Sequence, residues 1–189
     1  LGAIDVMEKK RKRSGATEIA LTLFSFAYKN GIPEGCLYYA DLRALENPAW
    51  KIRDYKTKTG VDGDVKAFVF KSARAQKKYA DILGSLKRLQ EVANGALKVG
   101  IGCKSGQHRS VAFVEKLSAE ASLNVTNVLH LEQSKVEGIA RLPTFRCSCC
   151  GIKPKGCNEM NIHLLGKKHS KKQAKLRKRR GRLNPGETS

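Results

Sequence analysis

Four metal-ligand residues near the carboxyl end constrain this 189-residue chain more than any other feature. Two residues separate Cys147 from Cys150. Twelve residues later, a gap of five residues separates His163 from His169. Two thiolates on a tight turn and two imidazoles on a helix can close a tetrahedron around Zn²⁺. A segment this small buries too little surface to fold alone, so the metal must supply the missing stability. The spacing therefore predicts one zinc ion held by these four residues.

The gap between the two histidines predicts a break in the helix that carries them. Residues six apart differ by roughly 120° around an ideal helix axis, so His163 and His169 do not share a face of one straight helix. Gly166 lies between them, where the helix must loosen. Phe145, before the cysteines, and Met160 are expected to form a miniature core.

The pattern that runs from Phe145 to His169 resembles the matrin-type and double-stranded-RNA-binding zinc fingers. That resemblance implies a small ββα-like finger over residues 144–170 and binding to structured RNA. Pro154 departs from the family pattern, because many such fingers carry an aromatic residue there. Cys149 and Cys157 are additional thiols, and either of them can compete as a ligand.

A formal net charge of +20 indicates a polyanionic partner, because so large a surplus repels itself without one. One basic block spans residues 9–13. Ten further basic residues extend the finger helix and are the predicted contacts to RNA phosphates: Lys167, Lys168, Lys171, Lys172, Lys175, Arg177, Lys178, Arg179, Arg180 and Arg182. A nuclear import signal is the alternative reading of this stretch, and the two roles are compatible.

Strand and helix patterns alternate through the amino-terminal two thirds of the chain. Apolar periodicity predicts strands near 19–26, 36–40, 97–101 and 125–131, and helices over 72–93 and 110–121. Such alternation predicts an α/β fold, with a mixed, partly parallel sheet and flanking helices. The resulting divisions are a basic arm (1–15), an α/β domain (16–132), a linker (133–143), the finger (144–170) and a basic tail (171–189).

The longest apolar run covers about ten residues, whereas a membrane span needs about 20. We therefore expect no membrane partner. Four of the six cysteines lie between Cys147 and Cys157, which favours metal binding in a reducing compartment over a disulfide framework.

The loop over residues 101–110 lies between a predicted strand and a predicted helix, and it suits a phosphate group. Its Cys103-x5-Arg109-Ser110 pattern resembles the signature of the protein-tyrosine-phosphatase superfamily, which implies Cys103 as nucleophile and Arg109 as phosphate ligand. Gly102 replaces that superfamily's usual histidine, and no general acid is evident. A phosphate site without catalysis is the alternative.

Four short stretches, 25–33, 41–48, 59–62 and 102–111, together resemble the C-terminal domain family of the RNase adapter protein RapZ. The resemblance spans roughly residues 17–132. It implies an α/β domain that binds an amino-sugar phosphate and contacts small RNA. The phosphate-binding residues it implies are Ser105, Gly106, His108 and Arg109, with Asp41, Arg43 and Asp62 lining the same pocket.

No Walker-type loop precedes residue 17, so nucleotide hydrolysis is not expected and an enzyme is the less favoured class. The reading that combines these features is an RNA-binding component of a ribonucleoprotein particle, bound to other proteins of that particle. The expected location is the nucleus or nucleolus, with the cytoplasm or an organelle as alternatives. Two other functions stay open: a Cys103-dependent phosphatase, and a phosphosugar-sensing regulator of RNA processing.

Overall fold

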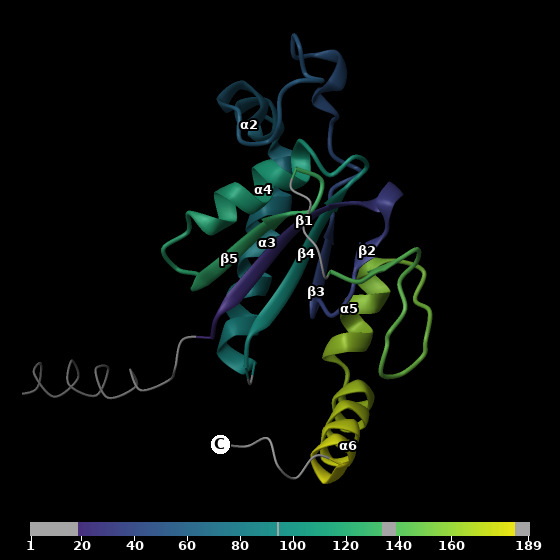
Figure 1. Cartoon of the computed structure of the whole chain (residues 1–189). Helices are drawn as coiled ribbons and strands as arrows, with labels where there is room; N and C mark the ends of the chain where they lie inside the picture. The colour runs from purple at the N-terminus through teal and green to yellow at the C-terminus, as the bar shows by residue number, and fades with distance from the viewer. Residues whose placement is uncertain (1–18, 94, 134–138, 184–189) are drawn as a thin grey trace, which may run out of the picture.

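The computed structural model describes residues 19–93, 95–133 and 139–183 (Figure 1). The predicted basic arm over residues 1–15 lies outside these residues, as do residues 134–138 of the predicted linker and the last six residues of the predicted tail.

Four parallel strands form the central sheet. They are β1 (Leu21–Ala27), β3 (Tyr38–Asp41), β4 (Leu97–Cys103) and β5 (Val125–His130), arranged in the order β3-β4-β1-β5. Nearly every residue of β1 and β4 is buried, so both faces of the sheet are apolar at its centre. That pattern is typical of parallel sheets, which are covered on both sides. The predicted α/β class is confirmed.

Helices cover one face of the sheet (Figure 1). They are α3 (Ala73–Val92) and α4 (Arg109–Ser118), and α2 (Gly63–Phe70) packs against these two helices. Leu21 and Leu23 of β1 belong to the same hydrophobic cluster as Ile82 and Leu86 of α3. The Ser72 hydroxyl accepts a hydrogen bond from the backbone of Ala75 and so fixes the start of α3. The predicted helix over 72–93 is confirmed, while α2 was not anticipated.

The carboxyl-terminal module covers the other face. Phe24 and Phe26 of β1 and Tyr39 of β3 form one buried cluster with Phe145 and Met160 from this module. The Tyr39 and Phe145 rings meet edge to face, with centroids 5.2 Å apart. The expectation that the finger has a miniature core of its own, separate from the α/β domain, is therefore wrong.

Two helices and a turn make up this module. Helix α5 (Cys157–Leu165) ends at Gly166, and α6 (Lys167–Leu183) follows at once. Gly166 has an extended backbone conformation, so the predicted break between the two histidines is confirmed. Residues 144–170 contain no strand, which differs from the expected ββα-like arrangement. The short strand β6 (Arg141–Leu142) precedes them and pairs with β2 (Ile32–Pro33).

Asn161 of α5 closes the exposed edge of the sheet. Its side-chain oxygen accepts a hydrogen bond from the Tyr39 N–H, and its side-chain amide donates to the Tyr39 carbonyl, both at 2.8 Å. Strand β3 is an edge strand, and an unpaired edge is a template for pairing with another chain. The asparagine supplies the two bonds that a neighbouring strand would make.

Among the helices that the structure describes, none has both the length and the apolar character needed to cross a bilayer.

We expect Asn161→Ala to lower the free energy of unfolding by about 1–3 kcal/mol, because it leaves two backbone groups of Tyr39 without partners. The measurement is urea denaturation of the full chain, followed by both circular dichroism and tyrosine fluorescence. Ile162→Ala, at a residue 74% exposed on the same helix, is the matched control and should cost little. Equal stability of the two variants would contradict this role of Asn161.

Candidate anion site and metal centre

Three parallel strands end side by side at one edge of the sheet, where α/β proteins bind their ligands. Strand β3 ends at Asp41 and β4 ends at Cys103. The Leu42 N–H donates to the Gly102 carbonyl at 2.8 Å, so the segment after β3 continues alongside the end of β4. Most of the residues that sequence reasoning assigned to a phosphate site lie at this edge.

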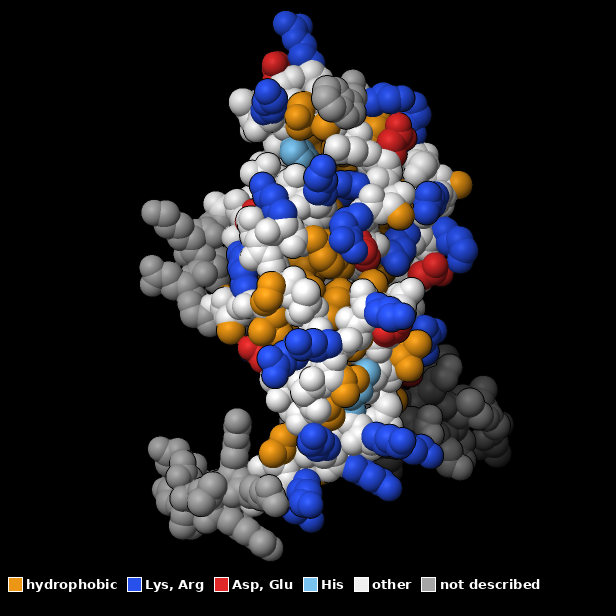
Figure 2. Space-filling view, turned by 90° about the vertical axis from the view of Figure 1, so that its right-hand side faces the viewer, with side chains coloured by type: hydrophobic (Ala, Val, Ile, Leu, Met, Phe, Trp, Pro, Cys, Tyr) orange, Lys and Arg blue, Asp and Glu red, His pale blue; other side chains and the backbone are white. Residues whose placement is uncertain are grey.

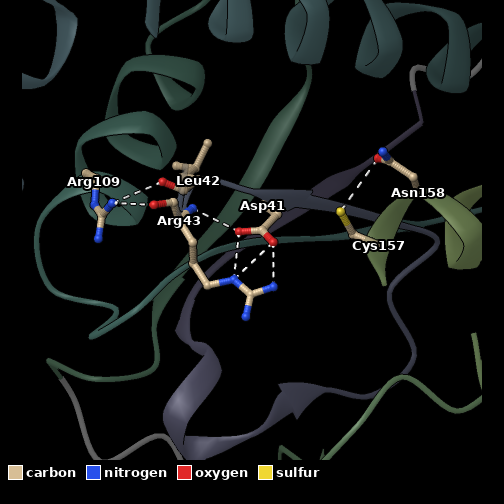
Figure 3. Close-up of polar contacts among 6 residues, drawn as sticks. All are labelled: Asp41, Leu42, Arg43, Arg109, Cys157 and Asn158. Carbon is tan, nitrogen blue, oxygen red and sulfur yellow. Dashed lines mark hydrogen bonds and ion pairs between the residues drawn. The ribbon is translucent and has the colours of Figure 1, made fainter. Parts of the chain in front are cut away.

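Arg43 is held in place by Asp41 (Figure 3). Its Nε and Nη2 donate to Asp41 Oδ2 at 3.0 and 2.7 Å, and the Arg43 backbone N–H donates to Oδ1. The guanidinium carbon lies 4.0 Å from the centre of the Tyr28 ring, a cation–π contact. The Arg43 side chain is 52% exposed, so a charged ligand can reach it.

Tyr28 is a site residue that sequence reasoning missed. Among the described residues, its hydroxyl is the buried side-chain polar atom that has no hydrogen-bond partner. Burial raises the pKa of Tyr28, and Asp41 adds to the effect, so the phenol stays protonated. Its ring also packs against Phe145 of the carboxyl-terminal module, with centroids 6.3 Å apart. Tyr28 lies within the family-like stretch 25–33, but only the fold brings it beside Arg43.

Arg109 has a structural role beyond the one expected. It is only 5% exposed, and its Nη1 donates to the backbone carbonyls of Leu42 and Arg43 at 3.2 and 3.1 Å (Figure 3). It also donates to the Leu45 carbonyl at 2.7 Å. These bonds use Nη1 and give Arg109 a structural role, while its role as a phosphate ligand stays a prediction. Arg109 fixes the segment that carries Arg43.

Cys103 is poorly placed for phosphatase chemistry. It is 2% exposed and belongs to the core cluster beneath the helices. Its sulfur accepts a hydrogen bond from the Gly106 N–H at 3.2 Å and lies 3.2 Å from the Ser110 hydroxyl. The Gly106 N–H, which could otherwise bind a phosphate oxygen, is thus bonded to the thiol. A nucleophilic sulfur must be accessible to substrate, and the Cys103 sulfur is buried.

Gly106 is the tightest point of the loop. Its φ of +71° suits glycine, and a Cβ atom there would lie 2.7 Å from the Ala27 nitrogen and 2.3 Å from Glu132 Cγ. Ser105 beside it is half-buried and Lys104 is exposed.

His108 and Asp62 are engaged within the protein. His108 Nε2 lies 2.8 Å from the Tyr55 carbonyl oxygen. The Asp62 carboxylate accepts hydrogen bonds from the Thr59 N–H and hydroxyl, so it shapes its own turn. The structure therefore brings together Asp41, Arg43 and Arg109, whereas the hydrogen bonds of the Asp62 carboxylate are to Thr59 in its own loop.

Glu132 is a second residue that sequence reasoning missed. It accepts hydrogen bonds from the Ala27 N–H, the Asn30 side chain and Arg141 Nη1. These bonds join the ends of β1 and β5 to β6 beneath the loop at Gly106. Burial alone would raise the pKa of Glu132, but the bonds from Arg141 and Asn30 outweigh it and hold the pKa below its usual range.

A cavity of about 210 Å³ opens beside Asp41, between the segment after β3 and helix α3. Three cationic side chains contribute to its lining: Arg74, Lys77 and Lys78. Asp81 also lines it and forms an ion pair with Lys77.

The cysteines and histidines of the carboxyl-terminal module converge on one point. The sulfur atoms of Cys147, Cys149 and Cys150 and Nδ1 of His169 all lie within 4.8 Å of one another. His163 Nε2 lies 3.1 Å from His169 Nδ1. A Cys/His set of this size can hold one metal ion, and such soft donors suit zinc. Two turns in the backbone position the sulfurs, with Cys147 N–H bonded to the Ile152 carbonyl and Gly151 N–H to the Cys147 carbonyl.

The basic residues after the finger lie on α6 (Figure 2). Lysine side chains of α6 that the structure describes are all exposed: Lys167, Lys168, Lys171, Lys172, Lys175 and Lys178. The side chains of Arg177, Arg179, Arg180 and Arg182 lie outside the described part, although the helix backbone continues through them.

Residues 19–134 match the RapZ C-terminal domain family. The chain belongs to this family. A nucleotide-binding protein of Gloeobacter violaceus is 39% identical over 108 residues, which cover 55% of this chain and 36% of the relative. A nucleotide-binding protein from Acinetobacter baumannii is 39% identical over 127 residues, which cover 64% of this chain and 44% of the relative. A nucleotide-binding protein from Cereibacter sphaeroides is 34% identical over 145 residues, which cover 71% of this chain and 46% of the relative. The chain thus spans less than half the length of these relatives.

This membership overturns two expectations. The reading as a ribonucleoprotein component is wrong, because the relatives are bacterial proteins named for nucleotide binding. The nuclear or nucleolar location is wrong for the same reason, since bacterial cells have no nucleus. The zinc-finger resemblance lies outside the family match and stays a prediction.

Arg109→Ala should lower the free energy of unfolding by about 2–3 kcal/mol, because it removes the donor shared by three carbonyls of the 42–45 segment. Thermal and urea denaturation of the full chain provide the measurement. Arg74→Ala, at an exposed arginine on α3, is the matched control. If the Arg109 variant were as stable as this control, the arginine would not be structural.

Glu132→Gln should destabilise the protein by roughly 1–2 kcal/mol at neutral pH. The lowered pKa means that the stabilisation is fully present above the ordinary glutamate pKa of about 4.3 and is lost as the pH falls through the folded-state value. The difference between variant and parent should therefore shrink as the pH falls below about 4.3. Urea denaturation at a series of pH values measures this difference in the free energy of unfolding. A difference that does not change with pH would contradict the role of the ionised Glu132 carboxylate.

Proposed function

We propose that this chain is a phosphosugar-sensing regulator of RNA processing. The observation that carries the proposal is the arrangement at the carboxyl edge of the sheet. There Asp41 holds the exposed Arg43 guanidinium over the ring of Tyr28, whose buried hydroxyl has no hydrogen-bond partner among the described residues. Membership of the RapZ C-terminal domain family supports the same reading.

A phosphate group suits this edge for two reasons. The amino-terminal end of α4 carries partial positive charge and free backbone N–H groups, and α4 begins directly after the loop. Arg43 adds a full charge with Nη atoms that can bind two oxygens at once. Because Arg109 is buried against the 42–45 carbonyls, it positions Arg43 and is a weaker candidate for direct phosphate contact.

The sugar part of the ligand needs polar partners and room. An unpartnered buried hydroxyl costs free energy, which a ligand oxygen or nitrogen bonded to Tyr28 would remove. The Asp41 carboxylate can accept hydrogen bonds from hydroxyl or ammonium groups, as an amino sugar offers. The cationic cavity beside Asp41 extends the space and favours a ligand of net negative charge.

Helix α6 supplies the surface for RNA in this proposal. Its exposed lysines form a row of cations with few aromatic side chains for stacking bases. Such a surface binds phosphate backbone and favours duplex shape over base sequence. The nucleotide-binding names of the relatives are compatible with a phosphate-rich partner.

We also propose that the Cys/His cluster holds one zinc ion with a structural role. Helix α5 and Phe145, which flank the cluster, pack on the sheet and on Tyr28. A metal ion bound there would keep the carboxyl-terminal module packed against the sheet face beside Tyr28 and Arg43.

Calorimetric titration of the full chain with a hexosamine 6-phosphate tests the ligand site. Arg43→Gln should weaken binding by about 10–100-fold, because a charge-assisted bond to phosphate contributes about 1.5–3 kcal/mol. Arg53→Gln is the matched control, because the Arg53 side chain is 96% exposed in the loop before α2. Equal affinity for these two variants would overturn the site.

Sensing requires that the ligand alter RNA binding. The affinity for one RNA hairpin should change when the hexosamine 6-phosphate saturates the protein, and the change should be absent in Arg43→Gln. An unchanged affinity in the parent protein would contradict the regulatory role. Hydrolysis of a generic phosphate ester that is lost in Cys103→Ser would instead favour the phosphatase.

A further inference from the structure

Five donor groups converge in the carboxyl-terminal module, whereas a tetrahedral metal site needs four. Cys147, Cys149, Cys150, His163 and His169 supply them. The zinc-finger spacing uses two of the three cysteines and both histidines. The tightest cluster in the structure uses all three cysteines and His169 alone.

His169 is the common neighbour of the other four donors. Its Nδ1 lies 3.4, 3.5 and 3.6 Å from the sulfurs of Cys147, Cys149 and Cys150. It also lies 3.1 Å from His163 Nε2. Metal–ligand lengths of about 2.3 Å for sulfur and 2.0–2.1 Å for nitrogen place tetrahedral ligands roughly 3.3–3.8 Å apart. All four separations are therefore close to those of ligands on one ion.

Cys149 and His163 reach the same centre from different elements. Cys149 lies in the turn between the other two cysteines, with its sulfur 3.6 Å from that of Cys147 and 3.4 Å from that of Cys150. His163 lies in the last turn of α5, before the break at Gly166. Because the two donors belong to separate segments, one can leave the centre while the other stays.

We propose that the metal centre has an exchangeable fourth ligand. Cys147, Cys150 and His169 are its constant ligands, and either Cys149 or His163 completes the tetrahedron. This inference rests on the proposed zinc. Three thiolates give a zinc centre one net negative charge, whereas two thiolates and two imidazoles give a neutral one. When His163 nitrogen replaces the Cys149 sulfur on the ion, the released thiolate takes up a proton from solvent, and the charge at the base of the cationic helix α6 rises by one unit while the ion stays bound.

Metal content and cobalt spectra of four proteins test the exchange: the parent chain, Cys149→Ser, His163→Ala and the double variant. Each single variant should retain about one zinc per chain by mass spectrometry, because four donors remain. The double variant should lose stoichiometric metal. With Co²⁺ in place of zinc, thiolate-to-cobalt absorption should be stronger in His163→Ala than in Cys149→Ser, since three thiolates remain in the first and two in the second.

Cys157→Ser is the matched control, because this buried thiol of the same module contacts Asn158 rather than the cluster. It should keep the metal and the parent spectrum. A thermal melt of each variant shows whether it folds, and Cys149→Ala or His163→Asn replaces any that does not.

Loss of metal from His163→Ala alone would mean a fixed Cys2His2 site, and loss from Cys149→Ser alone a fixed Cys3His site. Either result overturns the exchange and leaves the proposed zinc intact. A parent chain without metal would overturn the zinc proposal as well, so the two failures are distinguishable.

Discussion

The requirement that a parallel sheet be covered on both faces governs this structure. Strands β1 and β4 are apolar on both sides, and α3 and α4 cover one face, with α2 packed against these helices. The other face carries Phe24, Phe26 and Tyr39, which water would otherwise surround. Burying such aromatic side chains contributes about 1.5–3 kcal/mol each. The carboxyl-terminal module provides that burial, so it is a third layer of the fold.

This layering links the metal centre to the ligand site. Phe145 lies two residues before Cys147 and packs on Tyr28, whose ring supports Arg43. On the same side, burial raises the pKa of the Cys157 thiol, and the nearby Asp41 carboxylate adds to the effect. Helix α5 thus approaches both the Arg43–Asp41 pair and the Cys/His cluster. Residues that neither bind metal nor touch ligand therefore connect the two.

The corrections concern residues whose roles depend on neighbours distant in sequence. Arg109 follows a glycine-bearing loop, which favours a phosphate contact. In the fold its Nη1 donates hydrogen bonds to backbone carbonyls of the 42–45 segment. Cys103 matches a phosphatase pattern, yet its side chain points into the core beneath α4. Glu132 belongs to none of the motifs and Tyr28 to the 25–33 stretch, and each acquires its role from strands that only the fold brings together. The basic tail predicted a nuclear ribonucleoprotein, but the family of the α/β domain and its bacterial relatives contradict that prediction.

The sequence alone determined the α/β class, the boundaries of α3 and α4 to within a few residues, and the break at Gly166. Those features follow from local periodicity and spacing, which each short segment carries by itself. It also determined the family, because four short motifs in order belong to one domain. Only the tertiary structure decided that the finger shares a core with the sheet and that Asn161 closes the β3 edge. Contacts between residues more than one hundred positions apart depend on how layers pack, and no local pattern encodes that.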